Sequence, residues 1–172
     1  MLKMIVAMTR NSGIGYKGDI PWHYSQDLKR FRKITGKSPI IMGRKTWDSL
    51  PKQPLPNRLN VVLSRDPMRV HPLCEGMTVV SSPEEALYTL RNYPEVWIIG
   101  GQMIYEKFIR HPLLKTIDCT IIPDNYECDT HFTNIPERFA KLDITKTPTD
   151  FGELIHRTYS VPDPDWMFQN YA

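Results

Sequence analysis

Residues 39–50 read PIIMGRKTWDSL, and this stretch shows the arrangement on which the fold depends. The apolar PIIM predicts a buried strand, Gly43 follows it, and a short helix is predicted over 44–50. The same order recurs where VWIIGG at 96–101 precedes a helix predicted over 102–110. An alternation of buried strands and helices is typical of an α/β domain with a largely parallel sheet.

Further elements are predicted on both sides of this stretch. Strands are predicted at 2–8, 59–64 and 77–80. One helix is predicted over 25–34 with Ser25 as its N-cap, and another to about Leu90 behind Ser82, where an N-cap serine, a proline and a glutamate coincide. From Thr116 onward the pattern indicates strands alone. The sequence therefore predicts a mixed sheet with helices on both faces.

The stretch GIGYKG at 13–18 matches the glycine pattern of a dinucleotide-binding turn. That turn needs a helix that opens on its last glycine, but Pro21 biases Ile20 away from helical geometry. No acidic residue lies where the second strand of such a unit would end. We interpret the stretch as a long glycine-containing loop, of the kind that serves as a lid or binding loop.

Composition excludes several function classes. The chain has 172 residues and a net charge of +3, and its basic residues are scattered, which argues against a nucleic-acid partner. The first apolar stretch, Met4 to Met8, is too short to span a membrane. The three cysteines show no Cys-x-x-Cys spacing, so we expect free thiols in a reducing compartment. The five histidines form no metal-binding pattern, and no metal site is expected.

Asp27 shares one face of its predicted helix with Leu28, Phe31 and Ile34, while the helix's cations fall mostly elsewhere. One interpretation is that Asp27 only stabilises the helix N-terminus. The other is a buried acid at the floor of a pocket, where a carboxylate can accept two parallel hydrogen bonds from an amidine-like edge.

Residue types that bind phosphate follow the ends of three predicted strands, in the segments 43–46, 64–65 and 100–102. Each stretch joins a strand end to glycines, hydroxyls or cations, and ligands of α/β sheets lie outside the carboxyl ends of strands. The pattern predicts an extended phosphorylated ligand, and Arg44 with Arg65 favours a ribose 2′-phosphate. Arg58, beside a rigid turn, is either a surface residue or a clamp for a ligand carboxylate.

Together these motifs resemble the dihydrofolate reductase family over residues 1–159. The resemblance rests on their order and spacing. Its pieces are Ile14-Gly15, Pro21-Trp22, Asp27 with Leu28 and Phe31, MGRKTW at 42–47, PLPNR at 54–58, LSR at 63–65, IIGG at 98–101 with Tyr105, Thr120, and DTHF at 129–132.

The resemblance implies a single domain over 1–160, built on a central mixed, mostly parallel eight-stranded sheet flanked by about four helices. Residues 161–172 would be a C-terminal extension of unknown role, either a loose tail or a segment that docks its aromatics. The implied reaction is NADPH-dependent reduction of 7,8-dihydrofolate, with hydride transfer to C6 and protonation of N5. The GIGYKG loop would close over the cofactor, with its glycines as joints.

The resemblance also implies residue roles. Asp27 would bind the pterin and promote protonation, Thr120 would hydrogen-bond to Asp27, Trp22 would position a water, and Ile20 would pack over the cofactor. The expected substrate-binding residues are Ile5, Val6, Ala7, Asp27, Leu28, Phe31, Leu50, Leu55, Arg58, Ile99, Tyr105 and Thr120. The expected NADPH-binding residues are Ala7, Ile14, Gly15, Gly43, Arg44, Lys45, Thr46, Leu63, Ser64, Arg65, Ile99, Gly100, Gly101, Gln102, Met103, Ile104 and Tyr105, with a cis Gly100–Gly101 peptide bond.

Two other functions stay open at this point. A reductase of a riboflavin-pathway pyrimidine would share the cofactor residues but lack the pairing of Trp22 with Asp27 and also Arg58. A non-catalytic pterin-binding protein would keep the scaffold without needing Asp27, Thr120 and Trp22. We further expect a cytoplasmic monomer with no nucleic-acid or membrane partner.

Overall fold

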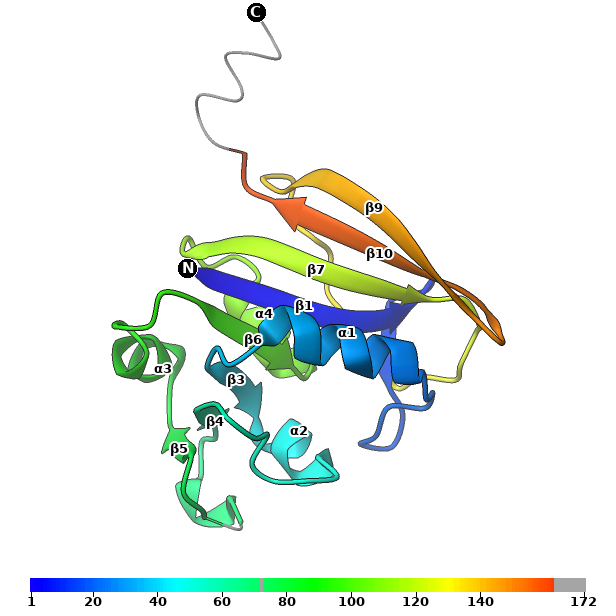
Figure 1. Ribbon diagram of the computed structural model, residues 1–172. Coiled ribbons are helices and arrows are strands. Elements are labelled where there is room, and N and C mark those ends of the chain that lie inside the picture. Colours follow the sequence, from blue (N-terminus) through cyan, green and yellow to red (C-terminus); the bar gives the residue numbers. More distant parts are fainter. Residues whose placement is uncertain (72, 163–172) are drawn as a thin grey trace, which may run out of the picture.

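An eight-stranded sheet forms the centre of the computed structural model, which describes residues 1–71 and 73–162 (Figure 1). From one edge to the other its strands are β5 (Met77–Val80), β4 (Asn60–Leu63), β3 (Ile40–Gly43), β6 (Val96–Gly100), β1 (Leu2–Thr9), β7 (Leu114–Ile122), β10 (Gly152–Ser160) and β9 (Ala140–Thr149). The first six pair in parallel, and β10 runs antiparallel to both β7 and β9. The predicted mixed, mostly parallel sheet is therefore confirmed.

Helices cover both faces of this sheet, as predicted. They are α1 (Ser25–Thr35), α2 (Arg44–Ser49), α3 (Pro83–Thr89) and α4 (Gln102–Phe108), with a short 3₁₀ helix η1 (Pro67–Arg69). On one face, Trp47 of α2 and Phe31 of α1 pack with the buried strand residues Ile40 and Met42. On the other face, α3 and α4 contribute a larger cluster that includes Phe108. Because side chains alternate along each strand, the two clusters lie on opposite sides of the same strands.

Some helix boundaries differ from the sequence prediction. Ser25 is the first helical residue of α1 and not its N-cap; Tyr24 takes that place with extended backbone and no capping side chain. The helix predicted to reach residue 110 ends at Phe108. The Ser82 cap is confirmed, since its hydroxyl accepts a hydrogen bond from the Glu85 backbone N–H at 3.1 Å.

The GIGYKG stretch forms neither a helix start nor a phosphate turn. Its first half is the short strand β2 (Gly13–Gly15), which pairs antiparallel with β8 (Thr130–His131). The chain then reverses at Lys17 and Gly18, where positive φ values of 51° and 87° are found, and Gly18 takes this geometry without steric cost. Asp129 holds the turn by accepting a hydrogen bond from the Lys17 backbone N–H at 2.8 Å. The use of these glycines as joints for motion stays a prediction.

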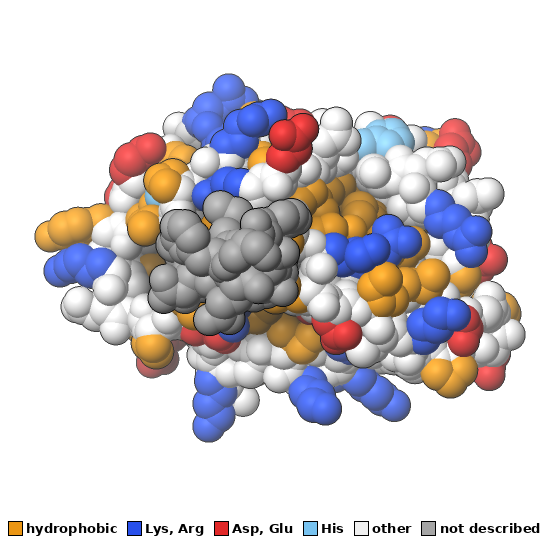
Figure 2. All heavy atoms as spheres, turned by 90° about the horizontal axis from the view of Figure 1, so that it is seen from above, with side chains coloured by type: hydrophobic (Ala, Val, Ile, Leu, Met, Phe, Trp, Pro, Cys, Tyr) orange, Lys and Arg blue, Asp and Glu red, His pale blue; other side chains and the backbone are white. Residues whose placement is uncertain are grey.

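On the face shown in Figure 2, Lys and Arg side chains do not gather in one patch but lie scattered among acidic and apolar ones. Cys74, Cys119 and Cys128 are free thiols, as predicted. Within residues 1–71 and 73–162, no helix combines the length and apolar character needed to cross a membrane. The aromatic residues of the C-terminal extension lie outside the described residues.

Candidate active site

Asp27 lies in the first turn of α1, half-buried against the sheet. Burial raises the pKa of this carboxyl above its usual value, and Asp118 adds to the increase. The Thr120 hydroxyl and Arg30 both act to lower the pKa, but burial outweighs them. Asp27 thus lies in surroundings that favour proton binding, and its hydrogen bond with Thr120 stays a prediction.

Apolar side chains extend this site along the face covered by α1 and α2. Ile5 packs there with Phe31, and Leu50, Leu55 and Ile99 join the same cluster. Ala7 packs against a separate cluster that contains Trp22, which is buried and tilts onto Tyr126 at a ring-centroid distance of 5.5 Å.

Two predicted site residues of this face lie open to solvent. Leu28 is 43% exposed and Ile20 is 56% exposed, so both present apolar surface without a protein partner to cover it. Leu28 follows Asp27 directly on α1, so exposed apolar surface adjoins the half-buried acid, as a flat, mostly apolar ligand requires.

Other predicted site residues point to the opposite face of the sheet. The side chains of Val6, Leu63, Ile104 and Tyr105 pack in the α3/α4 core cluster. Tyr105 nevertheless reaches through the sheet, since its buried hydroxyl lies 2.8 Å from the Ile5 carbonyl and 2.9 Å from the Ile99 carbonyl. Ile14 also packs against that cluster.

Arg58 is positioned by Thr35, the last residue of α1. Its Nη1 donates to the hydroxyl of Thr35 at 2.6 Å, and its Nε donates to the Pro56 carbonyl at 3.3 Å. Burial lowers the pKa of the guanidinium without removing its charge. The Thr35 hydroxyl in turn donates to the Phe31 carbonyl at 2.8 Å. A cation is therefore fixed beside the apolar face, and one of its terminal nitrogens has no protein acceptor among the described residues.

The glycines at the carboxyl ends of β3 and β6 allow two helix N-termini to approach each other. A Cβ on Gly43 would lie 2.9 Å from Ile104, and one on Gly101 would lie 3.3 Å from the Thr46 hydroxyl. Gly100 has a φ of 106°, and a Cβ there would meet the Tyr105 ring at 2.7 Å. The Gly100–Gly101 peptide bond is cis, as expected. Neither α2 nor α4 has a side-chain cap, so their first backbone N–H groups are left for a ligand.

The predicted phosphate-binding side chains at this edge are partly engaged within the protein. Arg44 forms an ion pair with Asp48, one helical turn on, at 2.6 Å. Ser64 is buried and its hydroxyl donates to the Asp66 carbonyl at 2.8 Å. Arg65 is exposed.

The start of α4 carries the other predicted residues of this edge. Gln102 donates from Nε2 to Glu106 at 2.9 Å and accepts from the His131 backbone N–H at 3.3 Å. Met103 is 55% exposed beside it. The start of α4 is thereby tied to β8 and to the loop that β8 holds.

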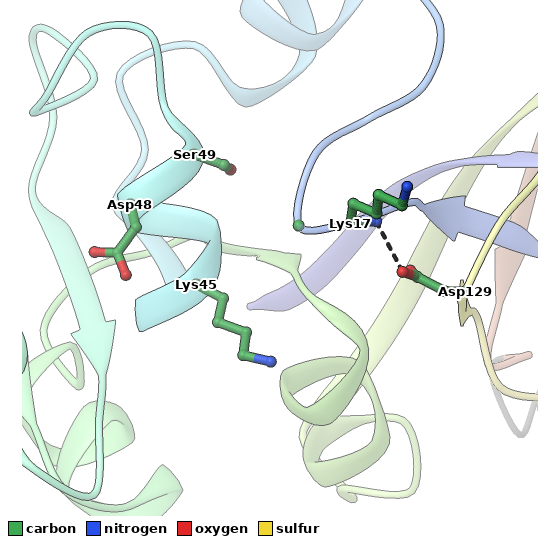
Figure 3. A pocket seen from close by; sticks show the side chains of 6 residues that line it. Lys17, Lys45, Asp48, Ser49 and Asp129 are labelled. Atoms are coloured by element: carbon green, nitrogen blue, oxygen red, sulfur yellow. Dashed lines mark hydrogen bonds between the residues drawn. The ribbon is translucent and has the colours of Figure 1, made fainter.

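A hollow lies between the GIGYKG loop and α2, as Figure 3 shows. Lys45 extends from α2 toward the loop, whose Lys17 is held by Asp129 on the opposite wall. The lining residues are Lys17, Gly18, Lys45, Asp48, Ser49 and Asp129. The hollow includes the predicted cofactor residue Lys45 and none of the predicted substrate residues.

Sequence reasoning missed the charged pair directly behind Asp27. Arg30, on α1, donates from both terminal nitrogens to the carboxylate of Asp118 on β7, the second bond measuring 2.8 Å. The two side chains are 19% and 8% exposed. Two features of the sequence point to this pair: the i, i+3 spacing of Arg30 from Asp27, and an acid placed between Ile117 and Cys119 in a largely buried strand.

His156 was missed as well. It lies on β10 with 4% exposure, and its ring contacts the hydroxyls of Thr120 and Thr147. Alternation places it on the inner face of its strand, but only the register of β10 against β7 brings it to Thr120.

Comparison with known proteins gives a consistent result. A family model described as dihydrofolate reductase matches residues 1–160. Dihydrofolate reductase of Aedes albopictus is 40% identical over 167 residues, covering 88% of each chain. The Bacillus subtilis enzyme of the same name is 39% identical over 163 residues, covering 91% of this chain and 94% of its own. That of Drosophila melanogaster is 36% identical over 151 residues.

Proposed function

This chain belongs to the dihydrofolate reductase family, and from that premise we propose how its residues divide the work. It is an oxidoreductase that reduces 7,8-dihydrofolate to tetrahydrofolate with a nicotinamide cofactor. Hydride is delivered to C6 of the pterin and a proton to N5. The finer assignments below are the proposal: NADPH as the cofactor, the site residues, a monomeric state and a cytoplasmic location, the last supported by three free thiols.

Asp27 is the residue to which we assign recognition of the pterin and promotion of its protonation. A carboxylate can accept two parallel hydrogen bonds from the 2-amino and N3 edge of the ring. The raised pKa of Asp27 brings its proton affinity closer to neutral pH, where a carboxyl acts best as an acid–base group. This burial of one acid in an apolar face is the observation that carries the proposal.

The apolar face next to Asp27 would hold the rings, and Arg58 would hold the far end of the substrate. Phe31, Leu50 and Leu55 offer a surface that excludes water from the reacting atoms. Arg58 is pre-positioned by Thr35, so little side-chain entropy is lost when it binds the substrate's α-carboxylate.

The donor set at the carboxyl ends of β3, β4 and β6 fits a dinucleotide with an added phosphate. Uncapped N–H groups open α2 and α4, and Arg44, Lys45, Thr46 and Arg65 supply cations and a hydroxyl. NADPH, when bound, supplies the hydride. The two arginines favour NADPH over NADH, because a ribose 2′-phosphate offers them a dianion that NADH lacks.

The test is a spectrophotometric assay with purified protein, dihydrofolate, and either NADPH or NADH. We expect turnover with both cofactors and a clear preference for NADPH. Arg44→Gln and Arg65→Gln should each raise KM for NADPH about tenfold and leave KM for NADH nearly unchanged. Equal kcat/KM for the two cofactors in the wild type would refute the NADPH assignment, and unchanged KM in both variants would place the 2′-phosphate elsewhere.

A further inference from the structure

His156 is a buried titratable group that the proposed mechanism does not use. Its ring lies between two hydroxyls, with Nδ1 at 3.2 Å from Oγ1 of Thr120 and Nε2 at 2.9 Å from Oγ1 of Thr147. Burial lowers the pKa of this histidine, and Arg30 lowers it further, so the ring is neutral at neutral pH. A neutral imidazole has one N–H donor and one acceptor nitrogen, and here each nitrogen has a partner.

The sheet register explains why this ring meets Thr120. β10 runs antiparallel to β7 with His156 opposite Thr120, and antiparallel to β9 with Leu154 opposite Thr147. Thr120 also acts on Asp27, whose pKa it lowers. Hydrogen-bonding groups therefore run from Asp27 on α1 through Thr120 and His156 to Thr147 on the edge strand β9.

The number of protons on these groups determines which group donates in each hydrogen bond of this line. When Asp27 is ionised it can only accept, so a hydrogen bond between Thr120 and Asp27 must use the single Thr120 proton. The oxygen of Thr120 must then accept from Nδ1–H of His156, which leaves Nε2 as an acceptor for the Thr147 hydroxyl. Every donor in the line consequently points toward the carboxylate, and such chains strengthen each member.

We propose that His156 is a positioning residue that holds the Thr120 hydroxyl toward Asp27 and stabilises the ionised carboxylate through its Nδ1–H tautomer. The proposal rests on the proposed role of Asp27. The charged groups that act on His156 are Arg30 from α1, which lowers its pKa, and Asp118 from β7, which raises it. On β9, Asp143 shares the strand face of Thr147.

The same geometry predicts a reversal when the carboxylate is lost. Without Asp27 as an acceptor, the Thr120 hydroxyl can donate its proton to Nδ1 of His156. The ring proton then moves to Nε2, where the oxygen of Thr147 can accept it. The tautomer of His156 thus reports whether an acceptor is present at position 27.

The direct test is the ¹⁵N NMR spectrum of the histidine rings at pH 7.5, recorded for wild type and Asp27→Leu. We expect Nδ1–H in the wild type and a shift toward Nε2–H in Asp27→Leu. The exposed His71 serves as the internal control and should not change. Nε2–H in the wild type, or the same tautomer in both proteins, would overturn the proposal, because a histidine that only fills space has no reason to respond.

A second test uses the pH dependence of hydride transfer. His156→Phe keeps an aromatic ring at this position but removes the N–H donor, so ionised Asp27 is less stabilised. The descending limb of the pH–rate profile should then move to higher pH by roughly half a pH unit. His156→Asn can place an amide N–H where Nδ1–H lies and should restore most of the wild-type profile. His71→Phe is the matched control and should leave the profile unchanged.

The outcomes separate this proposal from the one on which it rests. If His156→Phe fails to fold, the His156→Asn variant and the wild-type and Asp27→Leu spectra still decide the matter. An unchanged limb in a folded His156→Phe, or an equal shift in His156→Asn, would contradict a positioning role. If instead Asp27→Asn left the pH profile of hydride transfer as in wild type, the role of Asp27 would fail while the NMR response could still be observed.

Discussion

Replacing Asp118 by Asn should both destabilise the protein and move its pH profile, because Asp118 neutralises Arg30 directly behind Asp27. The substitution preserves size but removes one charge of a pair whose members are 19% and 8% exposed. Removing one partner of a fully buried pair costs about 3–5 kcal/mol. Because Arg30 keeps some contact with water and the amide oxygen can still accept one bond, we expect about 2–3 kcal/mol. For a chain of this size that lowers Tm by roughly 4–12 °C.

The effect on chemistry follows from the charges acting on Asp27. Arg30 lowers the pKa of Asp27 and Asp118 raises it. Asp118→Asn removes the raising influence and leaves an unpaired cation, so Asp27 and the bound pterin together take up their proton at lower pH. The descending limb of hydride transfer should therefore move to lower pH, measured by stopped-flow NADPH oxidation in single turnovers.

The double variant Arg30→Met with Asp118→Leu is the control. An apolar pair of similar volume can replace a buried ion pair at little cost, so most of the lost Tm should return. Removing both charges also removes Arg30, which has the larger influence of the two on Asp27, so the limb should move to higher pH. A destabilisation of Asp118→Asn by less than about 1 kcal/mol would refute this reasoning. So would a descending limb of the pH–rate profile that moves in the same direction in both variants.

Three further predictions concern residues around the site. Asp27→Asn should raise Tm of the ligand-free protein at pH 7, because burial raises the pKa of Asp27 and the ionised carboxylate therefore destabilises the folded state. The gain in Tm should shrink as pH falls through the folded-state pKa toward 3.8, and a gain that grows in acid would show that the pKa is shifted in the opposite direction. Arg58→Leu should raise KM for dihydrofolate about 10- to 100-fold and leave KM for NADPH unchanged, with a smaller increase in Thr35→Val, which only frees the guanidinium; steady-state kinetics that show equal effects on both substrates would place Arg58 elsewhere. Asp48→Asn should release Arg44 and tighten NADPH binding by a few-fold in fluorescence titration, while weaker binding would show that Asp48 positions Arg44 productively.

Local sequence patterns predicted most of the fold because they carry most of the local physics. The strand–glycine–helix order at Gly43 and at Gly100 gave the parallel part of the sheet, and the capping residues around Ser82 gave the start of α3. The N-cap of α1 was misplaced because Ser25 has the right chemistry one position too late, and no side chain caps that helix. The strand β2 was missed because its partner lies more than a hundred residues away.

The same limit explains what was missed in the site. Asp27 could be identified because its position on an apolar helix stripe is a local feature. Two of the groups that act on its pKa, Thr120 and Asp118, come from β7, and their placement near α1 depends on tertiary packing that no local pattern encodes. The packing of the Val6 side chain in the α3/α4 cluster was not foreseen for a related reason, since the side on which a buried strand presents each residue cannot be read from a continuous apolar run.

The central claim is that Asp27 promotes protonation of the pterin during hydride transfer. The most direct measurement is the single-turnover rate of dihydrofolate reduction by Asp27→Asn across pH, made with NADPH and with NADPH deuterated at the transferred position so that the isotope effect identifies the chemical step. We predict a rate far below wild type near neutral pH that recovers partly in acid, where solvent protonates the substrate. A rate and pH profile equal to those of the wild type, with the isotope effect present, would contradict the claim.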